Sequence, residues 1–428
     1  PFPKTIWLFV RFLKRRSNSP YCPIGLLRGG TYIKTLFTGL CVWVWGGRPP
    51  AAAPLHLRDY CPPGFELMDG NRCELRTLYQ NYDSLRYAGV GGPRTGLPAV
   101  RDGFSPQQID LGRYLFFDPL LSQDSTVSCA SCHHPDLGFT DGRPRSVGVN
   151  GAEVRRAAPS LWNVAFLSNF FWDGRAATLE EQMQGPLYDA KEMGSNPASL
   201  LADIGSNETY RRLFREAYPG SEGPPSLDMI YTAIAAFQST LVSLNSRYDR
   251  YAHGYHDALT DAEKAGMNIF RSFVARCAEC HTPPLFTNQQ IAVIGVRDPE
   301  GVTFDAGAET ITGNPGLRGG FKVPSLRNVA QTAPYMHSGT FSNLRDAVEF
   351  YTLGRGHALP AEEKERITVH WHIWEPDLSD DELDRLVDFL ATLTDEAFKP
   401  QVPERVPSGL LPIGTVPEAL APQLSQTR

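Results

Sequence analysis

The sequence predicts a mostly α-helical protein made of two tandem repeats, with long loops and little β structure. The segment Pro159-Ser-Leu-Trp-Asn-Val-Ala165 recurs as Pro324-Ser-Leu-Arg-Asn-Val-Ala330, an offset of 165 residues. The same offset aligns Trp172 with His337, Gly174 with Gly339 and Leu179 with Leu344. A fixed offset over several positions indicates two homologous units. The 38 glycines and 35 prolines favour long connections, and we find no convincing run of alternating polar and apolar residues.

Length and composition are those of a folded protein of more than one domain. The 428 residues are 42% hydrophobic and 21% charged, with a formal net charge of −6. A chain of this length can bury a large core. The balance excludes a disordered chain and a polytopic membrane protein, and the weakly acidic charge argues against a general nucleic-acid binder.

The first 53 residues have the features of an export signal. Basic Arg28 and Lys34 precede an apolar run over residues 36–45, and the small residues at 51–53 predict cleavage after Ala53. A membrane anchor is the alternative, but the run is shorter than the roughly 20 residues that span a bilayer. We therefore expect a periplasmic protein. The leader contains eight basic and no acidic residues, which leaves residues 54–428 with a formal charge of −14 and favours a partner with a basic face.

Two cysteine motifs indicate the cofactor. Cys129-Ala-Ser-Cys132-His133 and Cys277-Ala-Glu-Cys280-His281 are copies of Cys-x-x-Cys-His, the signature of covalent c-type haem attachment. The two thiols add to the haem vinyl groups, and the adjacent histidine reaches the iron. A four-thiolate zinc site or two redox-active disulfides could use the cysteines, but neither explains the histidines. His133 and His281 are thus the predicted iron ligands of two cytochrome-c-like haem domains.

The expected domain order follows from these motifs. Residues 54–100 form an N-terminal preamble, 101–250 the first haem domain, 251–399 the second, and 400–428 a Pro-rich tail that lies on the surface. Cys61 and Cys73 flank turn sequences and predict a disulfide in an oxidising compartment.

Helix starts are marked by capping boxes. These are Ser105-Pro-Gln-Gln108, Thr260-Asp-Ala-Glu263 and Ser379-Asp-Asp-Glu382. Apolar residues at helical spacing define two further faces: Ile230, Ile234, Phe237 and Leu241 in the first repeat, and Leu383, Leu386, Val387 and Leu390 in the second.

The combined motifs resemble those of a known family. The two haem motifs, Phe171-Trp-Asp-Gly-Arg175 and Ala333-Pro-Tyr-Met-His-Ser-Gly339 are similar to those of the bacterial di-haem cytochrome c peroxidases and their MauG-like relatives, over about residues 100 to 400. The preamble with its two cysteines is most similar to the MbnH subgroup. The resemblance implies an oxidoreductase that acts with hydrogen peroxide and has a first, peroxidatic haem and a second haem.

The resemblance also implies roles around the first haem. In the peroxidases a histidine 16 residues past the haem ligand blocks the iron; that position is Val149 here, so we expect an open iron. Met183 and Met193 remain possible ligands. Gln182 and Glu192 would lie on the distal side, with Glu192 as the acid/base. On their residue types alone, Glu192 could be a solvated loop acid and Gln182 a satisfied buried amide.

The second haem is expected to differ from the first. Leu344, Ala347, Val348 and Tyr351 share one helical face, where Tyr351 could be a core residue. The resemblance makes Tyr351 the second axial ligand, a position held by methionine in electron-accepting peroxidases and by tyrosine in MauG-like proteins. A phenolate favours ferric and higher iron states, whereas a thioether favours the reduced iron.

Trp172 and a calcium site complete the implied set. Trp172 could be an ordinary core aromatic, but the resemblance places it between the two haems. The family's calcium ligands match Thr332 and Pro334, whereas its asparagine is replaced by Ala157, so any calcium here has altered ligands.

Three functions follow. The first is a MauG-like peroxidase that oxidises a partner protein, with tryptophan-to-kynurenine conversion on a copper-binding protein suggested by the MbnH resemblance. The second is a conventional peroxidase fed by a small cytochrome or cupredoxin, against which Val149 and Tyr351 argue. The third is a non-catalytic di-haem electron-transfer protein, which predicts two six-coordinate low-spin haems.

Overall fold

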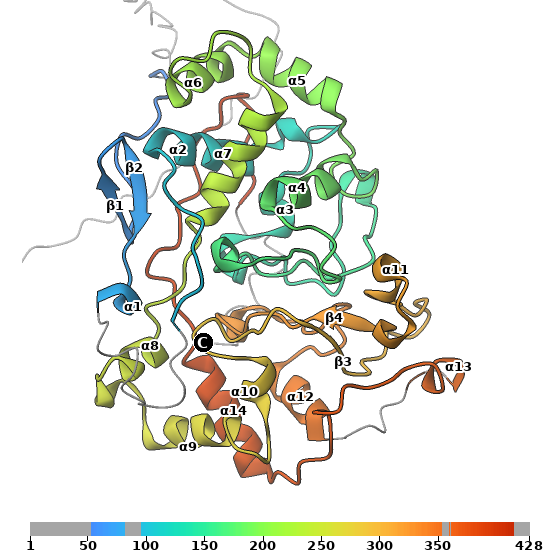
Figure 1. Ribbon diagram of the computed structural model, residues 1–428. Coiled ribbons are helices and arrows are strands. Elements are labelled where there is room, and N and C mark those ends of the chain that lie inside the picture. Colours follow the sequence, from blue (N-terminus) through green and yellow to red (C-terminus); the bar gives the residue numbers. More distant parts are fainter. Residues whose placement is uncertain (1–52, 82–95, 353–358, 360, 415–428) are drawn as a thin grey trace, which may run out of the picture. The chain divides into compact units, whose positions relative to one another are not determined.

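The computed structural model describes residues 53–81, 96–352, 359 and 361–414, and these are mostly helical (Figure 1). The part from Pro54 onward is one compact unit. The predicted leader lies outside the described residues except for Ala53. No helix in the described ranges has both the length and the apolar character that crossing a bilayer requires.

The helices and strands are short, and loops connect them over long stretches. The helices are α1 (Leu78–Asn81), α2 (Pro106–Phe117), α3 (Cys129–Cys132), α4 (Leu179–Tyr188), α5 (Pro197–Ser206), α6 (Glu208–Ala217), α7 (Leu227–Ser239), α8 (Arg247–Ala252), α9 (Asp261–Phe270), α10 (Cys277–Cys280), α11 (Glu309–Thr312), α12 (Leu344–Glu349), α13 (Ala361–Lys364) and α14 (Asp380–Ala391). Antiparallel pairs are formed by β1 (Phe65–Met68) with β2 (Arg72–Leu75) and by β3 (Ile291–Val293) with β4 (Gly320–Lys322). The mostly α prediction is confirmed.

One helix crossing occurs in each repeat and sets its core. Gly112 of α2 approaches α7 so closely that a Cβ would lie 1.8 Å from the carbonyl oxygen of Ala233. Gly266 of α9 approaches α14 in the same way: a Cβ added to it would lie 1.8 Å from the carbonyl oxygen of Arg385. Only glycine permits this backbone approach. The equivalent crossings support the prediction of homologous repeats.

Each crossing lies inside its own hydrophobic cluster. The first contains Leu115, Phe116, Phe237 and many residues of α4 to α7. The second contains Phe270, Leu386, Phe389 and Leu390 from α9 and α14.

All three predicted capping boxes form, at the starts of α2, α9 and α14. Leu241, predicted on the face of α7, lies beyond the end of that helix but is fully buried.

The repeated segment also repeats its backbone conformation. Asn163 and Asn328 both adopt left-handed φ values, 64° and 60°. The side chain of Asn163 donates to the carbonyl oxygen of Ser243 after α7 (3.0 Å), and that of Asn328 donates to the carbonyl oxygen of Asp395 after α14 (2.9 Å). Each asparagine therefore holds the segment that follows its repeat's last long helix.

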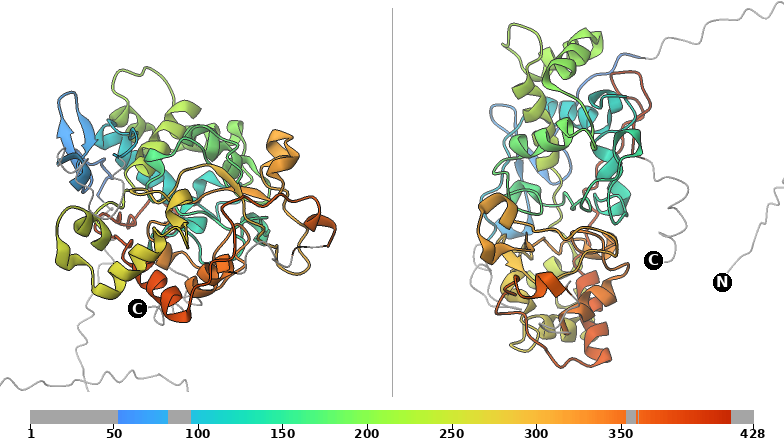
Figure 2. Two further views of the ribbon diagram at one scale, coloured as in Figure 1. Left: turned by 60° about the horizontal axis from the view of Figure 1, so that its bottom comes forward. Right: turned by 90° about the vertical axis from the view of Figure 1, so that its right-hand side faces the viewer.

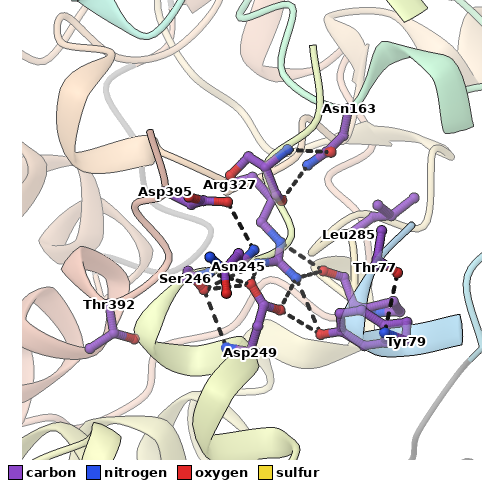
Figure 3. Close-up of polar contacts among 12 residues, drawn as sticks. Thr77, Tyr79, Asn163, Asn245, Ser246, Asp249, Leu285, Arg327, Thr392 and Asp395 are labelled. Atoms are coloured by element: carbon purple, nitrogen blue, oxygen red, sulfur yellow. Dashed lines mark hydrogen bonds and ion pairs between the residues drawn. The ribbon is translucent and has the colours of Figure 1, made fainter. Parts of the chain in front are cut away.

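A buried ion pair lies where the preamble meets both repeats (Figure 3). Arg327 donates two hydrogen bonds to Asp249, at 2.6 and 2.7 Å, and both residues are buried. The hydroxyl of Tyr79, from the preamble, donates to the same carboxylate (2.6 Å). Burial alone would raise the pKa of Asp249, but the adjacent guanidinium and these hydrogen bonds lower it.

The preamble and the tail pack on the first repeat. Cys61 and Cys73 form the predicted disulfide beside the β1–β2 hairpin. After α14 the chain returns to the first repeat (Figures 1 and 2), where Val402 packs against the first hydrophobic cluster and Val406 is part of it. The hydroxyl of Ser408 donates to buried Asp118 (2.7 Å). The described part of the tail is irregular and packs on the first repeat, with Val406 buried in its core.

The β3–β4 sheet was not expected from the sequence. Ile291 pairs with Lys322 and Val293 with Gly320, although α11 and long loops separate the two strands. Three-residue strands this far apart carry too little local pattern to be predicted.

Gly266→Ala is expected to destabilise the protein by about 1–3 kcal/mol or more, because the added methyl overlaps the backbone of α14. Denaturant unfolding of the haem-loaded protein measures the loss. Gly205→Ala in α5 is the matched control, since nothing lies within 4 Å of a Cβ there. Equal stability of the two variants would contradict the crossing.

Arg327→Met is expected to cost about 3–5 kcal/mol, because it leaves the Asp249 carboxylate buried and unpaired. The double variant Arg327→Met/Asp249→Leu removes both charges and should recover much of that loss. Thermal unfolding of the double variant and of the two single variants, Arg327→Met and Asp249→Leu, checks this. If the double variant loses as much as the sum of the two single variants, the residues are not coupled.

Candidate haem site

The first Cys-x-x-Cys-His motif forms a single helical turn that orients its histidine. Cys129–Cys132 make α3, and His133 caps it. His133 Nδ1 faces the carbonyl oxygen of Phe139 at 3.0 Å. Burial lowers the pKa of His133, although the Phe139 and Pro159 carbonyls oppose this. The ring is therefore neutral and fixed through Nδ1, which leaves Nε2 to bind a metal.

The second motif repeats this arrangement. His281 follows α10, and its Nδ1 faces the carbonyl oxygens of Phe286 (3.1 Å) and Pro324 (3.2 Å). Burial lowers the pKa of His281 to about 4. Pro159 and Pro324 are the first residues of the repeated segment, so that segment supplies a carbonyl to each histidine.

The four cysteines of the two motifs form no disulfide in the described structure. All four are free, and burial raises the pKa of Cys129, Cys132 and Cys277 to about 12. Cys129 packs against the first hydrophobic cluster and Cys277 against the second. Among the described residues, no group of three or more His, Cys, Asp or Glu side chains could hold a metal ion. The zinc alternative is not supported.

One large apolar cavity adjoins the second motif. It has a volume of about 300 Å³, and Cys277, Cys280 and His281 line it. Its other walls include all four residues predicted on one helical face: Leu344, Ala347, Val348 and Tyr351. Thiols and an oriented histidine beside an apolar space are what a covalently attached haem requires, so the residues fit the group.

Tyr351 lies just past α12 and shares this cavity with His281. Burial raises the pKa of its hydroxyl, and the two cysteines of the motif add to the shift. The hydroxyl is therefore protonated unless a metal displaces the proton.

Trp172 lines the same cavity and is held by its ring nitrogen. Its Nε1 donates to the carbonyl oxygen of Ala157 at 2.8 Å. Phe321 lies edge-on to Trp172, with ring centroids 6.5 Å apart, and stacks on His337 at 3.9 Å. Trp172 and His337, which the repeat offset aligns, therefore both contact the Phe321 ring.

The predicted calcium residues also meet here. Thr332, Pro334 and Ala157 line the cavity. Ala157 offers no side-chain oxygen, and its carbonyl oxygen accepts the hydrogen bond from Trp172. The calcium prediction stays untested.

Glu192 lies beside the first motif. Burial raises the pKa of its carboxyl to about 7, Asp189 adds to this and Arg175 opposes it. The charge of Glu192 in turn helps to raise the pKa of the Cys132 thiol, so the two groups are neighbours. Glu192 is therefore not the solvated loop acid that its residue type allowed.

Val149, from another loop, contacts Glu192. Its amide donates to the carbonyl oxygen of Glu192 at 2.9 Å, and its side chain is buried. A Cβ on Gly148 would lie 2.1 Å from the carbonyl oxygen of Lys191, so glycine permits this contact. The position predicted to lack a blocking histidine thus adjoins the predicted acid/base.

Gln182 and the two methionines lie near α4. Gln182 is half-buried at the edge of the helix face formed by Leu179, Met183 and Leu187, rather than within it. Met183 and Met193 both pack inside the first hydrophobic cluster.

Several residues around the cavity were missed by sequence reasoning. His337 Nε2 faces the Asp298 carboxylate at 3.1 Å, and burial lowers the pKa of Lys322 to about 8. The repeat offset already aligns His337 with Trp172, but it assigns His337 no role. Nothing in the local sequence marks Asp298 or Lys322.

Fold and site together fit a protein with two haem centres, one of them beside a titratable acid. A family model described as di-haem cytochrome c peroxidase matches residues 106–257. The chain is 35% identical to cytochrome c551 peroxidase of Nitrosomonas europaea, over 75% of this chain and 90% of that protein. It is 34% identical to methylamine utilization protein MauG of Methylorubrum extorquens, over 70% and 82%.

Similar solved structures are of the same kind of protein. A MauG-like protein associated with microbial copper homeostasis is 33% identical with a TM-score of 0.63, covering 71% of this chain and 94% of that one. The di-haem peroxidase BthA from Burkholderia thailandensis is 28% identical with a TM-score of 0.61, covering 73% and 91%. The chain belongs to the di-haem cytochrome c peroxidase and MauG family. It is a haem peroxidase, an oxidoreductase that acts with hydrogen peroxide.

The Glu192 carboxyl is expected to titrate with a midpoint near pH 7, protonated below and ionised above. pH-difference infrared spectroscopy would detect its carboxyl band, which Glu192→Gln should remove. Arg175→Leu should move the midpoint upward, because it removes a positive charge that favours ionisation. Glu181→Gln, an exposed change on α4, is the control. A wild-type midpoint near 4.5 would contradict the buried environment.

Proposed function

We propose that the protein is an exported, periplasmic MauG-like peroxidase that uses hydrogen peroxide to oxidise a partner protein. The observation that carries the proposal is Tyr351 in the cavity wall that it shares with His281. A tyrosine ligand favours oxidised iron, so the second haem would store oxidising equivalents and not accept electrons from a carrier. The finer proposal is conversion of tryptophan to kynurenine on a copper-binding protein, supported by the likeness to a MauG-like protein of copper homeostasis.

The residues divide between two haem domains, proposed as 101–250 and 251–399. Each haem supplies an iron that exchanges electrons with peroxide or with neighbouring groups. The thiols of Cys129, Cys132, Cys277 and Cys280 would hold the two haems covalently. His133, His281 and Tyr351 would be the iron ligands. Thr332 and Pro334 could contribute backbone oxygens to a calcium ion, with a third ligand other than Ala157.

In the first domain we assign proton transfer to Glu192. Reduction of one peroxide to two waters takes two electrons and two protons, so a group that exchanges protons near neutral pH is needed. With a pKa of about 7, Glu192 can accept the first peroxide proton and return it to the leaving oxygen. Gln182 would orient the peroxide through its amide. Val149 leaves the site without a histidine that competes for the iron.

Trp172 is proposed as the electron path between the two centres. Its ring lines the cavity beside the second motif, and the hydrogen bond to Ala157 fixes its orientation. An aromatic ring held in this way lies in one defined position for electron transfer.

A conventional peroxidase remains the second candidate, since the chain is 35% identical to a cytochrome c551 peroxidase. The two candidates differ at Tyr351. A cytochrome-fed enzyme needs a second haem that is readily reduced, which a tyrosine ligand opposes.

The decisive experiment matures the protein with both haems, records the ferric spin states and adds one equivalent of peroxide. We expect one high-spin and one low-spin haem, and a spectral change at both. Trp172→Phe should slow the change at the second haem at least tenfold, equivalent to about 1.4 kcal/mol in the barrier. Tyr351→Met should raise the second haem's reduction potential.

Two results would count against the proposal. Two low-spin haems with no peroxide reaction would indicate an electron-transfer protein. Wild-type turnover that requires a reduced cytochrome, with no mass change on a candidate partner's tryptophan, would favour the conventional peroxidase. Phe170→Leu, a nearby buried aromatic change, controls for general disturbance of the loop.

A further inference from the structure

Lys322 of β4 is a partly buried lysine with no acidic partner. Its side chain lines the cavity beside the second motif, and its Nζ donates to the carbonyl oxygen of Asn169 at 2.9 Å. The Phe170 ring lies 5.9 Å from the same Nζ. Burial lowers the pKa of the ammonium to about 8, and no carboxylate among the described residues opposes the shift. A charge withdrawn from water without a counter-ion costs stability, so packing alone does not explain this lysine.

The same lysine is bound to the loop that carries Trp172. The main-chain amide of Lys322 donates to the carbonyl oxygen of Trp172 at 2.7 Å. Asn169, which accepts from the ammonium, is three residues before Trp172. Phe321, the residue before Lys322, lies edge-on to the Trp172 ring. The ammonium therefore lies on the order of 10 Å or less from that ring.

The carboxylates next to this loop are already paired with arginines. Asp173 accepts from Arg156 at 2.6 Å and from Arg175 at 2.9 Å. Asp305 accepts two hydrogen bonds from the same Arg156, at 2.8 and 3.0 Å. These acids are thus neutralised by guanidinium groups, and the charge of Lys322 stays uncompensated.

Trp172 keeps its proton when it gives up an electron. Its Nε1 donates to the carbonyl oxygen of Ala157 at 2.8 Å, and a backbone carbonyl is too weak a base to take that proton. An electron vacancy on this ring is therefore a positive charge, which a neighbouring ammonium repels. Two unit charges on the order of 10 Å apart below a protein surface change an equilibrium by about tenfold.

We propose that Lys322 acts on the reaction through Trp172: its charge makes the oxidised ring unfavourable, so that electrons pass through Trp172 while no vacancy remains on it. The inference rests on the proposed function, which makes Trp172 the electron path. The benefit is protection of the ring. A lasting vacancy leads to replacement of an indole C–H bond by a C–OH bond with oxygen from water. The two electrons and two protons released reduce one peroxide to two waters.

The test compares two variants of the haem-loaded full chain. Lys322→Met removes the charge and keeps an unbranched side chain, whereas Lys322→Arg keeps the charge. Lys364→Met, an exposed change on α13, is the control. Stopped-flow absorbance gives the rate of the change at the second haem after one equivalent of peroxide. Peptide mass spectrometry after repeated additions gives the fraction of Trp172 that has gained oxygen.

We expect Lys322→Met to speed the change at the second haem by about fivefold or more and to raise the oxidised fraction of Trp172 severalfold. Lys322→Arg and Lys364→Met should both stay within about twofold of wild type, since each keeps the charge beside Trp172. A faster change separates charge from packing, because a variant that only loosened the loop would slow electron transfer.

The pH profile is a second readout. Because the pKa of Lys322 is about 8, the wild-type rate should approach that of Lys322→Met as the amine loses its charge above this pH. The rate of Lys322→Arg should not follow, since a guanidinium stays charged. Glu192 and the pair of Asp298 and His337 are present in every variant, so their titration cancels in the comparison. If Lys322→Met does not fold, wild type and Lys322→Arg still decide the question.

Other outcomes would overturn the inference. A rate for folded Lys322→Met that is unchanged or lower, without added oxidation of Trp172, would make Lys322 a structural support of the loop. A faster change that persists in Lys322→Met/Trp172→Phe would show that the charge does not act through Trp172. Either result leaves the proposed function intact. If Trp172→Phe alone leaves the change at the second haem as fast as in wild type, the proposed electron path itself is overturned.

Discussion

The buried ion pair between Arg327 and Asp249 is the interaction on which the second haem site depends. Arg327 also donates to the carbonyl oxygen of Pro284 at 2.8 Å, two residues before Phe286. The carbonyl oxygens of Phe286 and of Pro324, three residues before Arg327, are the two that face His281. One guanidinium thus fixes both segments that orient the second histidine. Because the pair is fully buried, its attraction is little screened by water or salt, and its removal leaves a charge with no solvent to stabilise it.

The first repeat supports its motif histidine without an ion pair. Trp162 occupies the position of Arg327, and its ring lies edge-on to Phe139 with centroids 5.0 Å apart. Arg327 lies over the equivalent ring of Phe286 at 5.3 Å. Both rings belong to residues whose carbonyl oxygens face the histidine. The repeats therefore share the support of the ligand and differ in its chemistry: apolar packing in the first, an ion pair that also binds the preamble in the second.

Features set by neighbouring residues were predictable, and features set by distant ones were not. The capping box at Ser105 is local, because Ser105 and Gln108 exchange hydrogen bonds within one turn. The Cys-x-x-Cys-His motifs are likewise local, and they positioned His133 and His281. In contrast, the Asp298–His337 contact joins two loops 39 residues apart, and the β3–β4 pairing joins strands separated by α11. Residue types and spacing carry no record of such partners.

The same contrast between local and distant determinants applies to the site residues. Glu192 was identified by resemblance, but the raised pKa of its carboxyl arises from burial and from the charge of Asp189, which no spacing in the sequence predicts. Trp172 was identified by its motif, whereas its orientation comes from Ala157, in the position where the family has a calcium-binding asparagine. Trp172 and His337 begin as equivalent positions of a repeat and contact the same Phe321 ring from two directions. Duplication therefore supplied the symmetric frame, and substitution at matched positions supplied the difference between the two repeats.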